Sequence, residues 1–346
     1  MRPLTLKRLL WNCALLSAVL FVVVVIALKL GAVPVSLYGL GRDLIRVALH
    51  RSSELSSDYR FIVFDLRLPR ILLGILVGAS LSVAGASFQA LLRNPLADPY
   101  VLGVSSGASV GAILALIAAP YLNVGASLAA LLTPFGAFVG AAATIAAVYF
   151  LGRRDGQIDS GTLLLAGIIS ASFLSALITG LMSTLSSSNT RGMAFWLMGD
   201  LSTPLPSSLR WLFGVGFILA AGAIYTTASD LNLLLAGERE AMHLGVEVTR
   251  VKLVVYACAS VLTGLAVSVS GSIGYVGLLV PHVMRWLFGS DYRLLLPISA
   301  LGGAIAVVIA DTLARTVVAP RELPVGAMTA MAGAPLFIYL LRRRAS

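Results

Sequence analysis

The chain has 346 residues, of which 58% are hydrophobic and only 12% are charged, and its mean hydropathy is +0.95. Soluble proteins carry roughly 25% charged residues, so this composition excludes a soluble globular protein and indicates a polytopic membrane protein. The formal net charge is +10. The basic residues lie in short loops between apolar runs, where membrane topology and anionic lipid explain them better than a nucleic-acid partner does. Because the apolar runs are spread evenly, we expect one transmembrane domain over residues 1–346.

Apolar runs along the chain predict an all-α fold of about ten transmembrane helices, several of them short or broken, since a bilayer is spanned by about 20 helical residues. The runs are residues 9–28, 71–92, 101–121, 128–151, 162–185, 209–227, 251–270, 275–288, 294–313 and 325–341. A cleaved signal peptide would have an apolar region of only about 7–15 residues. The longer first run therefore favours an uncleaved span.

The distribution of basic residues predicts the orientation. An even number of spans places both termini on one side of the membrane. The basic head, with Arg2, Lys7 and Arg8, and the basic tail at 342–344 indicate that this side is the cytoplasm. Residues 30–70, the longest non-apolar stretch, then lie on the opposite side, although they carry several arginines that the positive-inside tendency does not explain.

Two of the predicted spans are unusually rich in small residues. Residues 268–277 hold three glycines and three serines, and irregular backbone at membrane depth is stable only where protein or a water-filled cavity covers it. Gly103, Gly107 and Gly111 follow one another at four-residue spacing. This stripe predicts either close packing against another helix or the lining of a translocation pathway, and the two are compatible.

Residues 231–250 form a long polar stretch on the predicted cytoplasmic side, in which charged side chains are interleaved with Leu244 and Val246. The pattern predicts one or two short amphipathic helices that are broken at Gly237 and Gly245. A short rigid helix fits a groove on a partner protein and transmits movement as a lever. An ordinary solvated loop is the alternative.

The motifs of enzymes and metal sites are absent or poorly matched. A P-loop needs a lysine between glycine and Ser/Thr, and none of the three lysines has that setting. Residues 103–107 match the G-x-S-x-G spacing of a nucleophile elbow, but they follow a proline-rich corner instead of a strand. His50, His243 and His282 lie in separate elements without metal-binding spacing. We therefore expect no enzyme activity, no metal and no cofactor on this chain.

Charged residues also lie at the predicted outer membrane edge. Arg67 and Arg70 flank Pro69, and Asp311 and Arg315 are four residues apart on one helix face. Asp311 and Arg315 either form a structural ion pair, or Arg315 faces a partner protein. The arginines either bind lipid phosphate or offer planar bidentate donors to acidic residues of a docking protein.

Six motifs carry a resemblance to a known family. They are RLPR (67–70), GASLSVAGASFQ (78–89), RNPLADP (93–99), LGVSSGA (102–108), GSIGYVGLLVPH (271–282) and ELPVGAMTAMAGAP (322–335). In this order, over essentially the whole chain, they resemble the membrane permease family of binding-protein-dependent ABC importers for iron chelates (siderophores, haem) and cobalamin.

The resemblance implies a multi-pass permease in the bacterial inner membrane that translocates an iron chelate, driven by ATP hydrolysis in a separate subunit. It implies a second copy of the chain, two ATP-binding cassette subunits that hold ATP and magnesium, and a periplasmic or lipid-anchored substrate-binding protein. Membrane lipid is expected around the chain, and no nucleic acid.

Together with the patterns above, the resemblance gives three groups of candidate residues. Binding-protein docking is assigned to Arg67, Arg70 and Arg315. Coupling to the ATPase is assigned to Gly237, Glu238, Glu240, His243, Leu244 and Gly245. The gate is assigned to Asn94, Leu96, Ser160 and Gly161, and the pathway to Gly103 and Gly107.

Two alternatives stay open. The sequence does not name the substrate, so a cobalamin permease of the same family is equally compatible with the motifs. A secondary transporter driven by an ion gradient would show ionisable residues near mid-membrane, where Asp311 is nearly alone.

Overall fold

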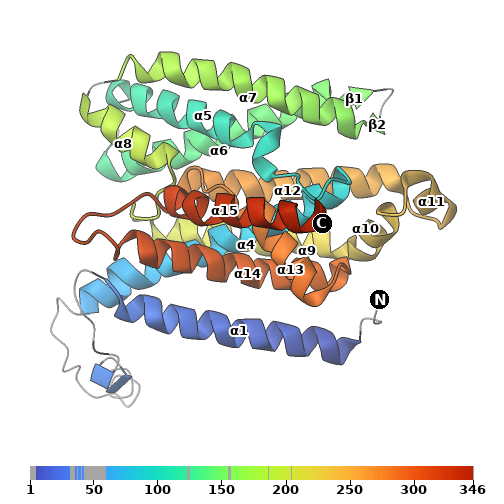
Figure 1. Ribbon diagram of the computed structural model, residues 1–346. Helices are drawn as coiled ribbons and strands as arrows, with labels where there is room; N and C mark the ends of the chain where they lie inside the picture. The colour runs from blue at the N-terminus through green and yellow to red at the C-terminus, as the bar shows by residue number, and fades with distance from the viewer. Residues whose placement is uncertain are drawn as a thin grey trace.

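Figure 1 shows the computed structural model, which describes residues 5–31, 36, 38–39, 41–42, 60–122, 125–154, 157–185, 187–203 and 205–345. The helices are α1 Leu6–Lys29, η1 Phe61–Arg67, α4 Leu68–Leu91, η2 Pro99–Leu102, α5 Val104–Ala118, η3 Ala119–Tyr121, α6 Ala126–Leu151, α7 Ser160–Met182, α8 Ser187–Leu197, α9 Ser207–Thr226, α10 Ala228–Leu234, α11 Glu238–His243, α12 Val248–Ser270, α13 Val276–Phe288, α14 Tyr292–Ala314 and α15 Val325–Ala345. The strands are β1 Arg153–Arg154 and β2 Gln157–Ile158. Predictions on Arg2, on His50 and on most of residues 32–59 lie outside the described residues.

The predicted helical membrane fold is confirmed. A helix covers each of the ten predicted spans, and eight helices of the described residues are long and apolar enough to cross a membrane. The other two are shorter, as expected: α13 has 13 residues, and the apolar part of α15 is Val325–Ile338. The two-residue hairpin of β1 and β2 is a small departure from an all-α chain.

The helix that contains the second predicted span begins before Ile71, because η1 already starts at Phe61. The wide turns of η1 run into α4 without a break, and the Leu68 N–H donates to the Val63 carbonyl, five residues back. Pro69 follows directly. A proline ring clashes with the carbonyl four residues earlier in a regular helix, and a widened turn relieves that clash. Charged residues before the proline thus belong to the helix.

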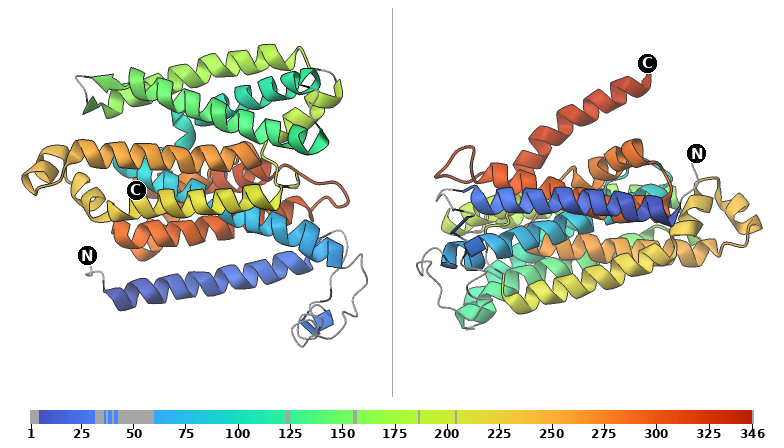
Figure 2. Two further views of the ribbon diagram at one scale, coloured as in Figure 1. Left: turned by 180° about the vertical axis from the view of Figure 1, so that it is seen from behind. Right: turned by 90° about the horizontal axis from the view of Figure 1, so that it is seen from below.

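The helix α4 forms the centre of the bundle, with α12, α13 and α14 packed around it (Figures 1 and 2). In the span Phe61–Leu91, 83% of the most apolar window is buried inside the chain. A Cβ added to Gly78 would lie 2.1 Å from the carbonyl oxygen of Gly303, and one on Gly85 would lie 1.8 Å from that of Gly277. The backbones of α4, α14 and α13 therefore touch directly, which only glycine allows at these positions.

The glycine stripe of α5 packs against α6. A Cβ on Gly107 would lie 2.0 Å from the Thr144 hydroxyl, and one on Gly111 would lie 2.0 Å from the carbonyl oxygen of Gly136. The packing interpretation of the stripe is confirmed. The predicted pathway role of Gly103 and Gly107 gains no support from these contacts and stays a prediction.

The irregular backbone between α12 and α13 is covered by protein, as the sequence predicts. Ile273 is buried, its N–H donates to the Tyr100 hydroxyl at 3.1 Å, and that hydroxyl donates to the Ile273 carbonyl at 3.2 Å. The end of α8 also packs here, since a Cβ on Gly271 would strike the Trp196 carbonyl oxygen. The helix α8 has no counterpart among the predicted elements, because its serine-rich sequence contains no long apolar run.

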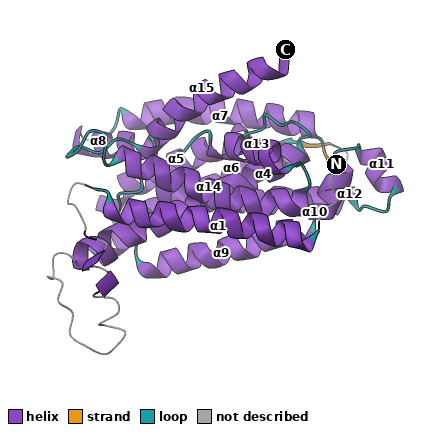
Figure 3. Ribbon diagram, turned by 60° about the horizontal axis from the view of Figure 1, so that its bottom comes forward, coloured by secondary structure: helices purple, strands orange, loops and turns teal. Residues whose placement is uncertain are grey.

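The helix α1 lies on the periphery of the bundle, alongside α14 (Figure 3). Only 6% of its most apolar window is buried. Arg8 donates to the carbonyl of Phe288 at 2.6 Å near one end, and Ala27 packs on Ile71 and Val308 near the other. The helix is thus held by contacts near both ends and, at Leu16, near its middle.

Candidate functional site

Two opposite ends of the bundle gather the predicted site residues. We name them the arginine end, where Arg67, Arg70 and Arg315 line one cavity beside the last residues of α1, and the α11 end, where α11 projects beyond the other helices (Figure 1). The N-terminal end of α1 lies toward the α11 end.

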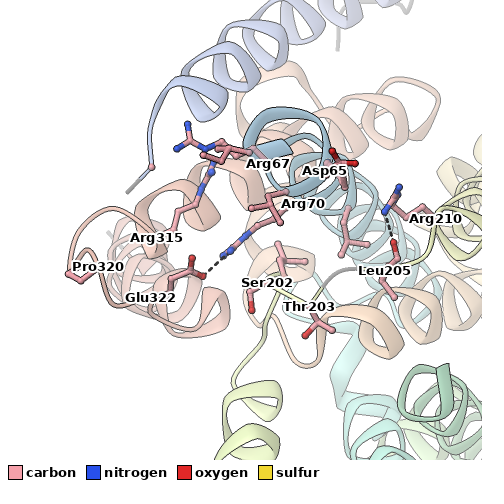
Figure 4. A pocket seen from close by; sticks show the side chains of 16 residues that line it. Asp65, Arg67, Arg70, Ser202, Thr203, Leu205, Arg210, Arg315, Pro320 and Glu322 are labelled. Atoms are coloured by element: carbon pink, nitrogen blue, oxygen red, sulfur yellow. Dashed lines mark hydrogen bonds and ion pairs between the residues drawn. The ribbon is translucent and has the colours of Figure 1, made fainter. Parts of the chain in front are cut away.

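A cavity of about 350 Å³ opens at the arginine end between η1, α4 and the loops that precede α9 and α15 (Figure 4). Its walls are strongly charged. The charged residues are Asp65, Arg67, Arg70, Arg210, Arg315 and Glu322. The structure thus brings the three predicted docking arginines together from distant parts of the sequence.

These arginines are largely buried and bind groups of the chain itself. Arg70 forms ion pairs of 2.8 Å with both Asp311 and Glu322. The predicted pairing of Asp311 with Arg315 is confirmed, at 3.5 Å. The closer partner of Asp311 is Arg70, which is 241 residues away in sequence, so no local spacing predicts this contact.

Two of the arginines also complete the end of α1. Arg67 donates to the carbonyls of Leu28 at 2.7 Å and Lys29 at 3.3 Å, and Arg315 donates to the carbonyl of Ala27 at 2.7 Å. The last carbonyls of a helix have no partner within it, and cations are favoured at this negative end. The arginines therefore have a structural role that the sequence did not indicate, and their docking role stays a prediction.

At the α11 end, residues 231–250 fold as predicted into short helices separated by glycines. Gly237 has φ +139° and Gly245 has φ +86°, which are conformations that favour glycine. The carboxylate of Glu240 folds over Gly237, because a Cβ there would strike its oxygen. The predicted breaks are confirmed, while the docking role of this segment stays a prediction.

The helix α11 has an apolar anchor and an apolar exposed tip. Ala241 is fully buried, whereas Met242 and Leu244 are 54% and 66% exposed. Arg239, Glu240 and His243 are exposed beside them. Two large apolar side chains thus lie exposed among charged ones at the end of the molecule.

The predicted gate residues lie near this end of the bundle. We name residues 92–98, which follow α4, the corner loop. The Asn94 side chain accepts from the Leu96 N–H at 2.9 Å, and Leu96 itself is exposed. The Ser160 hydroxyl donates to the Leu91 carbonyl at 3.3 Å, which joins the start of α7 to the end of α4, with Gly161 next to it. The structure thus brings the two predicted halves of the gate together.

Two carboxyl groups near the corner loop and α10 have shifted pKa values. Burial raises the pKa of Asp98 to about 6, and the hydrogen bond from the Tyr100 N–H opposes this. Hydrogen bonding from the Arg293 side chain lowers the pKa of Asp291, and Asn232 adds a second hydrogen bond. Asn232 thereby links α10 to the start of α14.

A polar network that the sequence analysis missed fixes the corner loop from inside the bundle. The Gln89 amide donates to the carbonyls of Leu278 at 3.2 Å and Ala97 at 3.5 Å, and its oxygen accepts from Arg285 at 3.0 Å. Arg285 also contacts the Tyr292 hydroxyl at 3.4 Å. These residues come from three helices and the corner loop, so no sequence spacing indicates that they meet.

No group of three or more His, Cys, Asp or Glu side chains that could hold a metal ion occurs among the described residues. His243 is exposed on α11, and His282 is buried on α13.

The sequence of this chain is similar to those of several transporter permease proteins. At 45% identity, the chain is similar to the uncharacterized ABC transporter permease protein YvrB of Bacillus subtilis, over 83% of this chain and 80% of that one. The cobalamin import system permease BtuC of Halobacterium salinarum is 43% identical over 82% and 74%. The hemin transport system permease HmuU of Yersinia pestis is 42% identical over 81% and 83%.

A solved structure described as an inward-facing conformation of a metal-chelate type ABC transporter superposes with a TM-score of 0.81 at 30% identity, over 96% of this chain and 98% of that one. The model of the FecCD transport family matches residues 19–343. On this match and these identities, the chain belongs to the FecCD transport family.

Proposed function

We propose that this chain is the permease subunit of a binding-protein-dependent ABC importer, which carries an iron chelate, either a siderophore complex or haem, across the bacterial inner membrane. The observation that carries the proposal is the family match over residues 19–343, together with the exposed apolar tip of α11. Cobalamin is the alternative substrate of the same class, since one relative is named for it.

The proposed assembly is a homodimer with two ATPase subunits and a substrate-binding protein. Apolar side chains along α7 and α15, such as Ile169, Phe173 and Met331, are exposed in the single chain, which supports covering of these faces by lipid and by a second copy. Both termini would lie in the cytoplasm together with α11. The chain itself would perform no covalent chemistry, and ATP and magnesium would be held by the partner subunits.

A secondary transporter is less compatible with the charges inside the bundle. The buried carboxylate Asp311 is neutralised by Arg70 and Arg315. A carboxylate held between two cations is poorly placed to bind and release a coupling ion.

Reconstitution tests the proposal directly. The permease, co-purified with its ATPase subunit and supplied with its binding protein in proteoliposomes, should take up a ferric siderophore, haem or cyanocobalamin only when ATP is present. The visible absorption spectrum of the purified binding protein identifies which of these it carries. Uptake driven by a proton or sodium gradient without the ATPase subunit would reject the importer function.

One variant tests the coupling role within the same assay. Gly245→Leu places a side chain on a backbone with φ +86°, so the end of α11 must rearrange. We expect this variant to insert and assemble but to lose uptake while ATP hydrolysis persists. Normal uptake at normal expression would remove the coupling role of the segment.

A further inference from the structure

The corner loop and α11 are joined by one carboxylate. Glu238, the first residue of α11, lies between two cations from different parts of the chain. Its Oε1 accepts from the Lys252 ammonium at 2.7 Å and from the Arg93 guanidinium at 3.4 Å. Arg93 belongs to the corner loop, and Lys252 lies in the first turns of α12.

The two ion pairs differ in strength. The Lys252 side chain is only 7% exposed, and its contact with Glu238 is short. A buried charge cannot lose its partner cheaply, so this pair holds the start of α11 on α12. The Arg93 side chain is 46% exposed and its contact is longer. Exposed ion pairs are weak and break easily, so this second pair is the one that can open.

The backbone conformation of Arg93 explains why opening its ion pair with Glu238 would affect the corner loop. Arg93 has φ +48°, a left-handed conformation that residues with a side chain adopt only when their surroundings hold them there. The contact with Glu238 is one such restraint. When it opens, the corner loop loses a contact that holds its first turn, and the loop also contains Asn94 and Leu96.

We propose that Arg93 and Glu238 form a breakable link through which displacement of α11 repositions the corner loop, with Lys252 as the fixed anchor of the link. The inference rests on the proposed function, in which an ATPase subunit moves α11. Arg93 and Glu238 are positioning residues in this proposal, since they would act through the corner loop that contains Asn94 and Leu96.

Accessibility of a cysteine in the corner loop measures its movement without any transported substrate. The parent protein carries Cys13→Ser, Cys258→Ser and Leu96→Cys and is assembled with its ATPase subunits. The rate of labelling by a membrane-impermeant maleimide is compared between the nucleotide-free state and the vanadate-trapped state. We expect the two rates to differ by roughly fivefold or more, the lower range of allosteric couplings.

Adding Arg93→Gln should reduce this ratio to below about twofold while ATP hydrolysis and assembly persist. Arg93→Lys keeps the charge and should restore most of the ratio. Arg293→Gln is the matched control, because it removes an exposed arginine whose ion pair is with Asp291 and not with the corner loop. Glu238→Gln is a poorer probe, since it also removes the carboxylate that contacts the buried Lys252.

The outcomes separate the two proposals. If the parent shows the nucleotide-dependent ratio and Arg93→Gln shows the same ratio, the link is rejected and the importer function stands. If the parent fails to assemble with the ATPase subunit, the proposed function is contradicted and the link falls with it. If the parent assembles but its ratio is one, the corner loop does not move with nucleotide, so the link is rejected and the importer function stands. Equal loss in the Arg93→Gln and Arg293→Gln variants would also reject the link, because a general charge effect would explain it.

Discussion

At the scale of single residues, the helices of this chain contain tightly packed and unpacked glycines that the sequence does not distinguish. Gly85 lies where α4 touches α13, and an added Cβ would lie 1.8 Å from the Gly277 carbonyl oxygen. Gly222 lies within α9, where an added Cβ would meet no atom within 4 Å. Both are helical glycines in apolar surroundings, yet only the first has a backbone against it.

These two positions therefore predict opposite effects of the same substitution. Gly85→Ala should lower the thermal unfolding temperature of the detergent-solubilised protein markedly, because α4 and α13 must move apart. Gly222→Ala should leave it unchanged or raise it slightly, since alanine in a helix interior is favoured over glycine by about 0.5–1 kcal/mol. Similar unfolding temperatures for the two variants would contradict the direct contact of α4 with α13.

At the scale of elements, α1 depends on arginines that the sequence assigned to docking. Arg67 and Arg315 bind the final carbonyls of α1, and hydrogen bonds from charged groups contribute about 1.5–3 kcal/mol each. A loss of binding-protein affinity after Arg67→Ala would therefore be ambiguous, because α1 would also lose part of its attachment. A test at Arg70 separates the two roles better, because Glu322 holds its guanidinium at the rim of the cavity.

Glu322 provides the test of docking at this cavity. Its carboxylate is 41% exposed and occupies one side of the Arg70 guanidinium. An acidic residue of the binding protein would compete with it for the same donors. Glu322→Gln should therefore increase the affinity of the binding protein for the solubilised permease several-fold at low salt, and less at high salt. Unchanged affinity, with unchanged unfolding temperature, would leave Arg70 a purely structural residue.

At the scale of the whole molecule, the sequence predicts the spans well because bilayer thickness dictates their length and composition. The glycine breaks at 237 and 245 were also predictable, since a local conformation decides them. The network of Gln89 with Arg285, and the contact of Arg93 with Glu238, were not. They join residues 196 and 145 positions apart, and such contacts follow from packing and not from local pattern.

The central helix connects the two ends of the molecule. The span Phe61–Leu91 is 31 residues long, and the 24 residues of α4 within it make about 36 Å of α-helix at a rise of 1.5 Å per residue. Arg70 at one end contacts the charged cavity, and the corner loop with Arg93 follows directly at the other. Because the helix is buried along most of its length, its two ends cannot move independently over large distances.

This continuity predicts a reciprocal effect between the ends. If nucleotide in the ATPase subunits shifts the corner loop, the affinity of the binding protein for the arginine end should change by roughly 5–150-fold between the nucleotide-free and vanadate-trapped complexes. Docking of the binding protein must then change nucleotide affinity by the same factor, since the coupling free energy is shared by both sites. In the Arg93→Gln variant both factors should move toward one together. If both factors stay unchanged in this variant, the ends communicate by a route that does not pass through Arg93.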